Sequence, residues 1–166
     1  MGYGGAIRDY QGTPLIIFYG SIGWNTNNVA KLEGLCRGLN LAQERGFFPL
    51  IAEGDSQIII TMASKLLQGS PVHKVSSSWR LAPRLDLLNQ WFSLHQAISF
   101  KHIRREGNKP ADFLANLGVD SGKDFFEGLL PSTVSEIQLS TFRDIVNNDM
   151  QSKEDSHPDA GDLNTS

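Results

Sequence analysis

Near its amino end the chain carries two apolar stretches on either side of a turn signal. The stretches lie near Tyr3–Arg8 and Leu15–Ile22, and both are rich in β-branched and aromatic residues. Between them the run Gln11–Pro14 contains Gly12 and Pro14, which are typical of turns. The pattern therefore predicts an antiparallel hairpin of two strands.

From about residue 26 the apolar positions recur every three or four residues, which is the period of an amphipathic helix. Polar residues suited to an N-cap precede this run, and Gly46 follows it in the place of a C-cap. A long helix is therefore predicted between them. Its apolar positions are Val29, Leu32, Leu35, Cys36 and Leu39, and its cap candidates are Asn25, Thr26 and Asn28.

The rest of the chain predicts two more strands and three more helices. A short apolar run after Phe47 reads as a buried strand that ends at Glu53, with Asp55 or Ser56 as the cap of the next helix. Further along we expect a helix over Pro83–Ser93, a strand over Ala97–Arg104 and a short helix over Pro110–Leu117. The order β-β-α-β-α-α-β-α indicates an α/β fold in which helices cover a mixed sheet.

Two carboxylates occupy positions where sites gather in such folds. Asp55 follows one predicted strand, and Asp112 opens the helix after another. Sites in α/β sheets collect at the carboxyl ends of strands, and Mg²⁺ prefers oxygen ligands of this kind. Either aspartate is also accounted for as a helix cap or as a partner of the helix dipole.

Composition limits the possible classes of protein. The chain has 166 residues, 40% of them hydrophobic, which suits one compact domain and a tail. Cys36 is the single cysteine, so an intramolecular disulfide is excluded, and no signal or membrane-spanning run is evident. We therefore expect an intracellular, soluble protein. Its net charge is −3, but the segment 149–166 holds five of the 18 acidic residues and one of the 15 basic residues. The rest of the chain therefore has 14 basic and 13 acidic residues and is nearly neutral.

Four ordered segments carry a resemblance to a known family: GYGGAIRD, TNNVAKLEGLCRGLNLA, EGDSQIII and HIRREGNKPADFLANLG. They resemble the type 1 ribonuclease H family, and in particular its reverse-transcriptase-like branch abundant in plants. The resemblance covers roughly residues 2–118. It implies an RNase H-like mixed sheet of five strands, and cleavage of the RNA strand of RNA–DNA hybrids with two Mg²⁺ ions held by four carboxylates.

Only two of those four carboxylates have a counterpart here. Asp55 and Asp112 match family ligands, and the resemblance makes them the catalytic and metal-binding residues. Lys31 stands where the family has a helix glutamate, and the first-strand aspartate would lie upstream of GYGG. We therefore expect an N-terminally truncated domain over residues 1–118 that lacks the first, central strand. Whether Met1 is the true start stays open.

The resemblance also implies residues that contact the nucleic acid. The amides at Asn27, Asn28, Gln57 and Asn108 match positions that bind the hybrid, and Arg104, Arg105 and Lys109 form a basic loop that could meet phosphates. The alternative without a function is that the amides are helix caps or surface residues and that the basic residues form a solvated loop. We expect His102 to be an ordinary residue on a strand face.

Lys31 is expected to impair the two-ion site. At about 100° per residue, Lys31 and Glu33 point to different sides of the helix, so Glu33 is interpreted as a solvated ion-pair partner of Arg37. An ammonium about 4 Å from a metal ion costs roughly 4 kcal/mol per unit of metal charge at an effective dielectric of 20. The second ion should therefore bind poorly.

Two functions follow as expectations. The first is a nucleic-acid-binding domain of the ribonuclease H type with impaired hydrolysis, whose partner is an RNA–DNA hybrid or another nucleic acid. The alternative is a non-catalytic nucleic-acid-binding or scaffold domain derived from a retroelement. Beyond Gly118 we expect a partly helical extension over residues 119–148 and, from its polar composition, a disordered acidic tail over 149–166.

Overall fold

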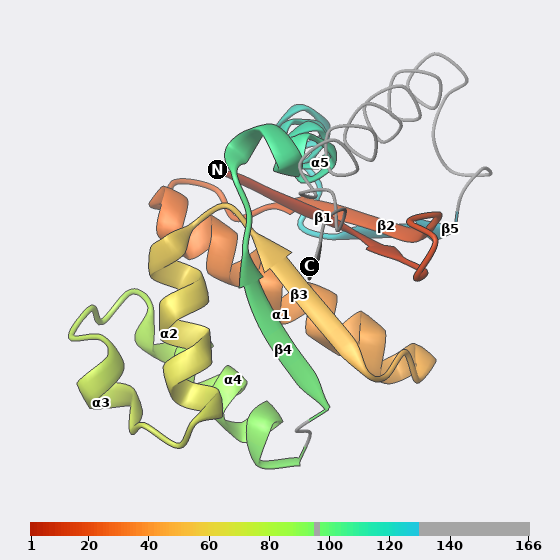
Figure 1. Cartoon of the computed structure of the whole chain (residues 1–166). Helices are drawn as coiled ribbons and strands as arrows, with labels where there is room; N and C mark the ends of the chain where they lie inside the picture. Colours follow the sequence, from red (N-terminus) through yellow and green to blue (C-terminus); the bar gives the residue numbers. More distant parts are fainter. Residues whose placement is uncertain (95–96, 130–166) are drawn as a thin grey trace, which may run out of the picture.

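The computed structural model describes residues 1–94 and 97–129 of the chain. Helices and strands alternate through these residues much as the sequence predicts (Figure 1). In chain order the elements are β1 (Gly2–Arg8), β2 (Pro14–Ser21), α1 (Asn27–Arg45), β3 (Leu50–Gly54), α2 (Gln57–Leu67), α3 (Val72–Val75), α4 (Ala82–Leu94), β4 (Ile98–His102), the 3₁₀ turn η1 (Arg105–Asn108), α5 (Lys109–Ser121) and β5 (Phe126–Leu129).

The predicted hairpin is confirmed. β1 and β2 pair antiparallel from Gly2 opposite Ser21 to Arg8 opposite Pro14, with an irregularity after Ile7. In the turn, the Asp9 carboxylate accepts hydrogen bonds from the backbone N–H groups of Gln11 and Thr13. This local bonding lets the chain reverse without leaving turn donors unsatisfied.

The predicted long helix is confirmed together with both of its ends. Thr26 is the N-cap of α1, and its hydroxyl accepts a hydrogen bond from the Val29 backbone N–H at 3.3 Å. Gly46 ends the helix at φ +68°, a left-handed conformation that glycine adopts without a Cβ clash. Between the two predicted caps of α2, the structure selects Ser56, whose hydroxyl accepts from Ile59.

Other boundaries differ from the prediction in ways that local pattern cannot resolve. The segment after Gly69, for which no helix or strand is predicted, contains the four-residue helix α3. α5 runs to Ser121, four residues past the predicted end, and closes at Gly122 with φ +62°. β5 is absent from the predicted order, because four residues with a glycine among them carry little strand signal.

The sheet is divided into two parts. β1, β2 and β5 form an antiparallel sheet in that order, and β3 and β4 form a separate parallel pair. The α/β class and the helix-covered mixed arrangement are confirmed, and the inner edges of β1 and β3 have no strand partner among the described residues. β5 pairs with β2, so the segment predicted as an extension beyond residue 118 begins by joining the sheet.

Alternating side chains of β2 bury against two helices. Ile16 and Phe18 pack in one cluster with Leu41 and Ala42 of α1. Ile17 packs in another cluster with Leu114 of α5. The antiparallel sheet is thus covered by α1 on one face and α5 on the other (Figure 1). A third cluster joins α1, α2, α4 and β4 through side chains such as Leu32, Ile59, Leu85 and Ile98.

Two predictions reach beyond the described residues. Residues 130–148 of the predicted partly helical extension and the acidic segment 149–166 both lie there. Within residues 1–94 and 97–129, none of the helices is long and apolar enough to cross a membrane.

Candidate functional site

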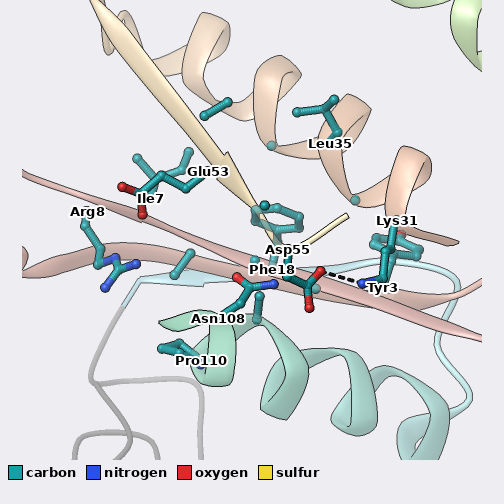
Figure 2. A pocket seen from close by; sticks show the side chains of 18 of the residues that line it. Tyr3, Ile7, Arg8, Phe18, Lys31, Leu35, Glu53, Asp55, Asn108 and Pro110 are labelled. Carbon is teal, nitrogen blue, oxygen red and sulfur yellow. Dashed lines mark hydrogen bonds and ion pairs between the residues drawn. The ribbon is translucent and has the colours of Figure 1, made fainter. Parts of the chain in front are cut away.

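A cavity of about 730 Å³ runs between β1 and β3, where the sheet is interrupted. α1 and α5 contribute to its walls (Figure 2). Among the sequence-predicted site residues, those that line it are Asn27, Lys31, Asp55, Asn108 and Asp112. The structure therefore brings both predicted carboxylates and the lysine to one cavity.

Asp55 lies between the end of β3 and the start of α2. The strand stops at Gly54 and Ser56 caps the next helix, so the aspartate between them is held at the mouth of this turn. Its side chain is only 5% exposed, and its carboxylate pairs with the Lys31 ammonium. The imidazole Nε2 of His102 lies 3.3 Å from the Asp55 backbone oxygen.

Lys31 reaches the cavity from the first turns of α1. It lies one turn after Asn27, so both residues occupy the same side of the helix, as the helical period predicts. Its side chain is 31% exposed and extends to Asp55, as Figure 2 shows. The predicted placement on the site side is confirmed, and the ammonium directly neutralises the most buried carboxylate of the cavity.

Asp112 lies in the first turn of α5, where a carboxylate also interacts favourably with the helix dipole. Its Oδ2 lies 3.5 Å from Nε of Arg105. The aspartate is 39% exposed and the arginine 80%, so this pair is solvated and weak. Both candidate metal ligands thus have a cationic neighbour.

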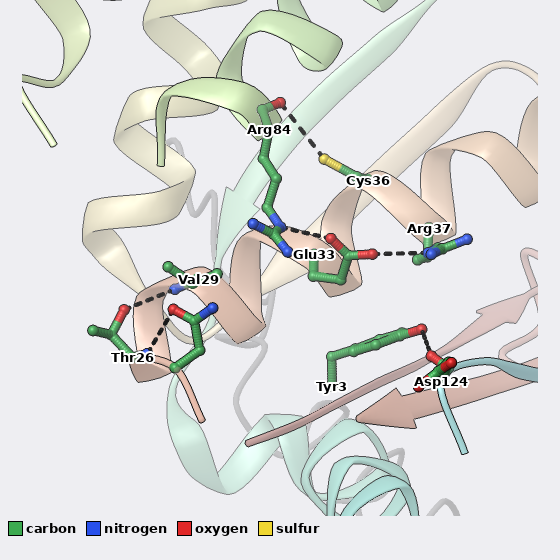
Figure 3. A network of polar contacts seen from close by, with 9 residues as sticks. Tyr3, Thr26, Val29, Glu33, Cys36, Arg37, Arg84 and Asp124 are labelled. Carbon is green, nitrogen blue, oxygen red and sulfur yellow. Dashed lines mark hydrogen bonds and ion pairs between the residues drawn. The ribbon is translucent and has the colours of Figure 1, made fainter. Parts of the chain in front are cut away.

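The interpretation of Glu33 as a solvated residue is wrong. Its side chain is 14% exposed and accepts hydrogen bonds from Arg37 at 2.9 Å and from Arg84 at 2.6 Å (Figure 3). The predicted pair with Arg37 is present, but Arg84 comes from α4, and the sequence contains no local signal for a contact across 51 positions. Glu33 therefore joins two helices, away from the cavity.

Five predicted contact residues do not line the cavity. They are Asn28, Gln57, Arg104, Arg105 and Lys109. Gln57 donates from its side-chain amide to the Thr61 hydroxyl at 3.1 Å along the surface of α2. Arg104 and Arg105 are exposed in the turn before α5, and His102 ends β4 with an exposed ring, as predicted for a strand-face residue. These side chains surround the site without forming its walls.

The donor set limits what the site can hold. Asp55 and Asp112 are its carboxylates from the predicted set, and each has a cationic partner. Across the described part of the chain, no group of three or more His, Cys, Asp or Glu side chains is arranged to hold a metal ion. Dications bind where uncompensated carboxylates converge, so these residues do not fit a two-ion magnesium site.

Sequence reasoning missed the small residues that shape the cavity. Ala30, Gly34 and Gly38 line it from α1 at intervals of four residues. Residues four apart share one helix face, so the spacing of the two glycines was a usable signal for a face that another element approaches closely. A Cβ on Gly38 would lie 3.1 Å from the Phe18 ring of β2.

Comparison with known proteins gives a family and a fold. The family model described as reverse transcriptase-like matches residues 2–118. None of the curated proteins compared with the chain matches it significantly. Among solved structures, RNase H1 from the halophilic archaeon Halobacterium salinarum NRC-1 aligns with a TM-score of 0.59 and 24% identity, covering 72% of this chain and 86% of that one.

A second solved structure agrees. The N-terminal RNase H domain of a Mycobacterium tuberculosis protein, solved as a fusion with maltose-binding protein, aligns with a TM-score of 0.60 and 26% identity. The alignment covers 73% of this chain and 83% of that one. The fold expected from the sequence motifs is therefore confirmed.

Proposed function

The chain belongs to the reverse transcriptase-like family, and we propose that it is a nucleic-acid-binding domain of the ribonuclease H type whose hydrolysis of RNA–DNA hybrids is impaired. The family activity inferred from the sequence is endonucleolytic cleavage of the RNA strand. Under this proposal the chain keeps the surface that meets a hybrid and has lost the charge distribution that cleavage requires.

The observation that supports impairment is the ion pair between Lys31 and Asp55. A two-ion mechanism needs carboxylates that hold two dications close together against their mutual repulsion. Here the position expected to supply one carboxylate supplies an ammonium, which also neutralises the neighbouring ligand. The attraction of the site for Mg²⁺ is reduced twice by one substitution.

We propose Mg²⁺ as the metal ion only on the basis of the family resemblance. Asp55 and Asp112 are the residues that would ligate an ion, and Lys31 stands where the resemblance implies a further carboxylate. Because the residues present do not fit two ions, no hydrolytic step is assigned to this chain.

We assign hybrid contacts to residues around the cavity mouth. Asn27 and Asn108 line the cavity. Asn28 and Gln57 each directly follow a lining residue in the sequence, at the starts of α1 and α2. Arg104 and Arg105 would contact phosphates, since exposed guanidinium groups bind phosphate oxygens without regard to sequence. Lys31 would add to this binding where the phosphate backbone approaches.

Hybrid binding is tested by fluorescence anisotropy with a labelled RNA–DNA hybrid at low salt. We expect saturable binding that weakens several-fold in Arg104→Ala/Arg105→Ala, because two phosphate contacts are lost. The matched control is Lys74→Ala, which removes an exposed charge from α3, on a different part of the chain. Absence of saturable binding, or equal loss in the control, would contradict the proposal.

A further inference from the structure

A second groove, of about 680 Å³, lies between α3 and α4. It shares no lining residue with the cavity beside β1. In Figure 1, α3 and α4 lie at the end of the molecule away from α5, whose first turn carries Asp112. The groove is therefore separate from the candidate site described above.

The walls of this groove are anchored to the apolar core. The Ser78 carbonyl, next to Trp79, accepts hydrogen bonds from the backbone N–H groups of Leu81 and Ala82, both at 3.1 Å. Leu81 is buried in the cluster that joins α1, α2, α4 and β4, and Val72 packs against the same cluster while also lining the groove. The turn that carries Trp79 is thus held in place from both sides.

Trp79 presents a free ring face. Its side chain lines the groove, and the guanidinium carbon of Arg80 lies 5.1 Å from the centroid of its ring. The guanidinium therefore covers one face of the indole. Because Trp79 is nevertheless 76% exposed, the opposite face is open to a planar ligand. Nucleobases stack on aromatic side chains placed in this way, and arginine contributes cation–π attraction to such sites.

Polar side chains line the groove together with this ring. Asp86 and Asn89 lie three positions apart on α4, so they share one face of the helix. Both are exposed, and neither has a hydrogen-bond or ion-pair partner within residues 1–94 and 97–129. A carboxylate accepts two hydrogen bonds from adjacent donors. Guanine is the base whose Watson–Crick edge carries two adjacent donors, N1–H and the 2-amino group.

The charges around the ring favour a neutral planar ligand over a cation. A cationic group stacked on Trp79 would lie close to the Arg80 guanidinium, which repels it. A nucleobase is neutral, and Arg80 would attract the phosphates that flank it. In a duplex the Watson–Crick edge is already paired, so only an unpaired base offers both its face and this edge.

We propose that the groove between α3 and α4 binds an unpaired guanine of a single-stranded nucleic acid, stacked on Trp79 with its Watson–Crick edge toward Asp86. This second site goes beyond hybrid binding at the cavity, and it rests on the proposed function only for the class of ligand. Stacking gives the affinity. The carboxylate gives a preference for guanine over adenine, whose Watson–Crick edge presents one donor and one acceptor.

The probe is a short single-stranded oligothymidine with one central guanine, added to the full chain labelled with ¹⁵N at tryptophan. We expect the Nε1–H signal of Trp79 to shift and saturate, while that of Trp24, which is also exposed, stays in place. The matched probe carries adenine instead of guanine and should bind several-fold more weakly. Equal affinity for the two probes, or equal shifts of the two signals, would overturn the proposal.

Substitutions separate stacking from base recognition, with affinity measured by fluorescence anisotropy of a labelled probe. Trp79→Ala should weaken binding of the guanine probe about tenfold, because the ring is lost, whereas Trp79→Phe should retain most of it. Asp86→Asn should abolish the preference for guanine and change binding of the adenine probe little. Trp24→Ala is the matched control. A loss in Trp79→Ala no larger than in this control would overturn the assignment.

A blunt-ended RNA–DNA hybrid separates this proposal from hybrid binding at the cavity. Trp79→Ala should bind the hybrid as the unmodified chain does, because a blunt duplex offers no unpaired base. If the unmodified chain binds the hybrid but not the guanine probe, the second site is overturned and the proposed function stands. If it binds the guanine probe but not the hybrid, the proposed function fails and the second site stands.

Discussion

Lys31 and Asp55 form the charged centre of the site, and their burial differs. The carboxylate is 5% exposed and the ammonium 31%, so the lysine retains water that the aspartate has lost. Removing the lysine would leave a nearly buried charge without its partner, which costs more than the pair contributes while intact. The same residue that disfavours a metal ion therefore supports the local fold.

We expect Lys31→Met to lower the free energy of unfolding by about 1–3 kcal/mol, measured by urea denaturation. The loss should largely disappear when Asp55→Asn is already present, because the uncompensated charge is then absent. Lys65→Met, at an exposed position of α2, is the control and should change stability little. An equal loss in both backgrounds would show that the ion pair is not the cause.

Cys36 gives a second test at the scale of one residue. Burial raises the pKa of its thiol from 9.0 to about 12, and the nearby Glu33 carboxylate adds to this shift. The raised pKa stabilises the folded chain fully below pH 9, and this contribution is lost as the pH rises toward 12.

At pH 8 we therefore expect iodoacetamide to alkylate Cys36 on the order of a hundredfold more slowly in the folded chain than in urea, because burial suppresses the thiolate and blocks access. Free-thiol assays over time check this rate. Similar rates with and without urea would contradict the burial of the thiol.

At the scale of elements, the predictions succeed where the signal is local. Thr26 and Gly46 define α1 because a cap acts on its own helix end, and the hairpin follows from its turn residues. β5 was missed because its four residues become a strand only by pairing with β2, more than 100 positions earlier. The contact of Arg84 with Glu33 was also missed, because the two residues are far apart in the sequence.

In the candidate site, too, local features were predictable and contacts between distant segments were not. The helical period placed Lys31 on the site side of α1, and the motifs singled out Asp55 and Asp112, so these three charged residues of the cavity were predictable, whereas its small residues were missed. Its ion pairs were not predictable, because they depend on how far separate elements approach one another.

Replacing either of two helix glycines by alanine should change the stability of the chain, but in opposite directions. A Cβ on Gly118 of α5 would lie 2.3 Å from the Gly20 backbone oxygen of β2, whereas one on Gly34 of α1 meets nothing closer than 3.6 Å. We expect Gly118→Ala to cost about 1–3 kcal/mol of stability through overpacking, and Gly34→Ala to gain up to about 1 kcal/mol from helix propensity. Thermal and urea unfolding measure both. Equal effects would contradict the close packing of α5 on β2.

At the scale of the whole molecule, charge limits the binding of nucleic acid. The net charge is −3, and the basic residues near the site are few, with Arg104, Arg105 and Lys109 grouped around η1 and the first residue of α5. Binding to phosphate depends on the number of cations that displace counterions. This chain should therefore bind hybrids weakly.

We expect the logarithm of hybrid affinity to fall with the logarithm of salt concentration with a slope of about −2 to −3, as for two or three phosphate contacts. Anisotropy titrations over a range of salt concentrations measure it. Nanomolar binding that persists at high salt would reveal a larger basic interface than the one around η1.

The central claim, binding without cleavage, is tested most directly by a hybrid-cleavage assay in Mg²⁺. Four proteins are compared: lysine or glutamate at position 31, each with and without a strand bearing an aspartate grafted upstream of Met1. The graft starts beside the cavity, because β1 begins at Gly2 and this residue lines the cavity.

We predict cleavage only in the protein with both changes, since each change alone leaves a carboxylate missing. Asp55→Asn in that protein should abolish the activity. If the unmodified chain cleaves the hybrid, and Asp55→Asn removes that cleavage, the account of Lys31 is contradicted.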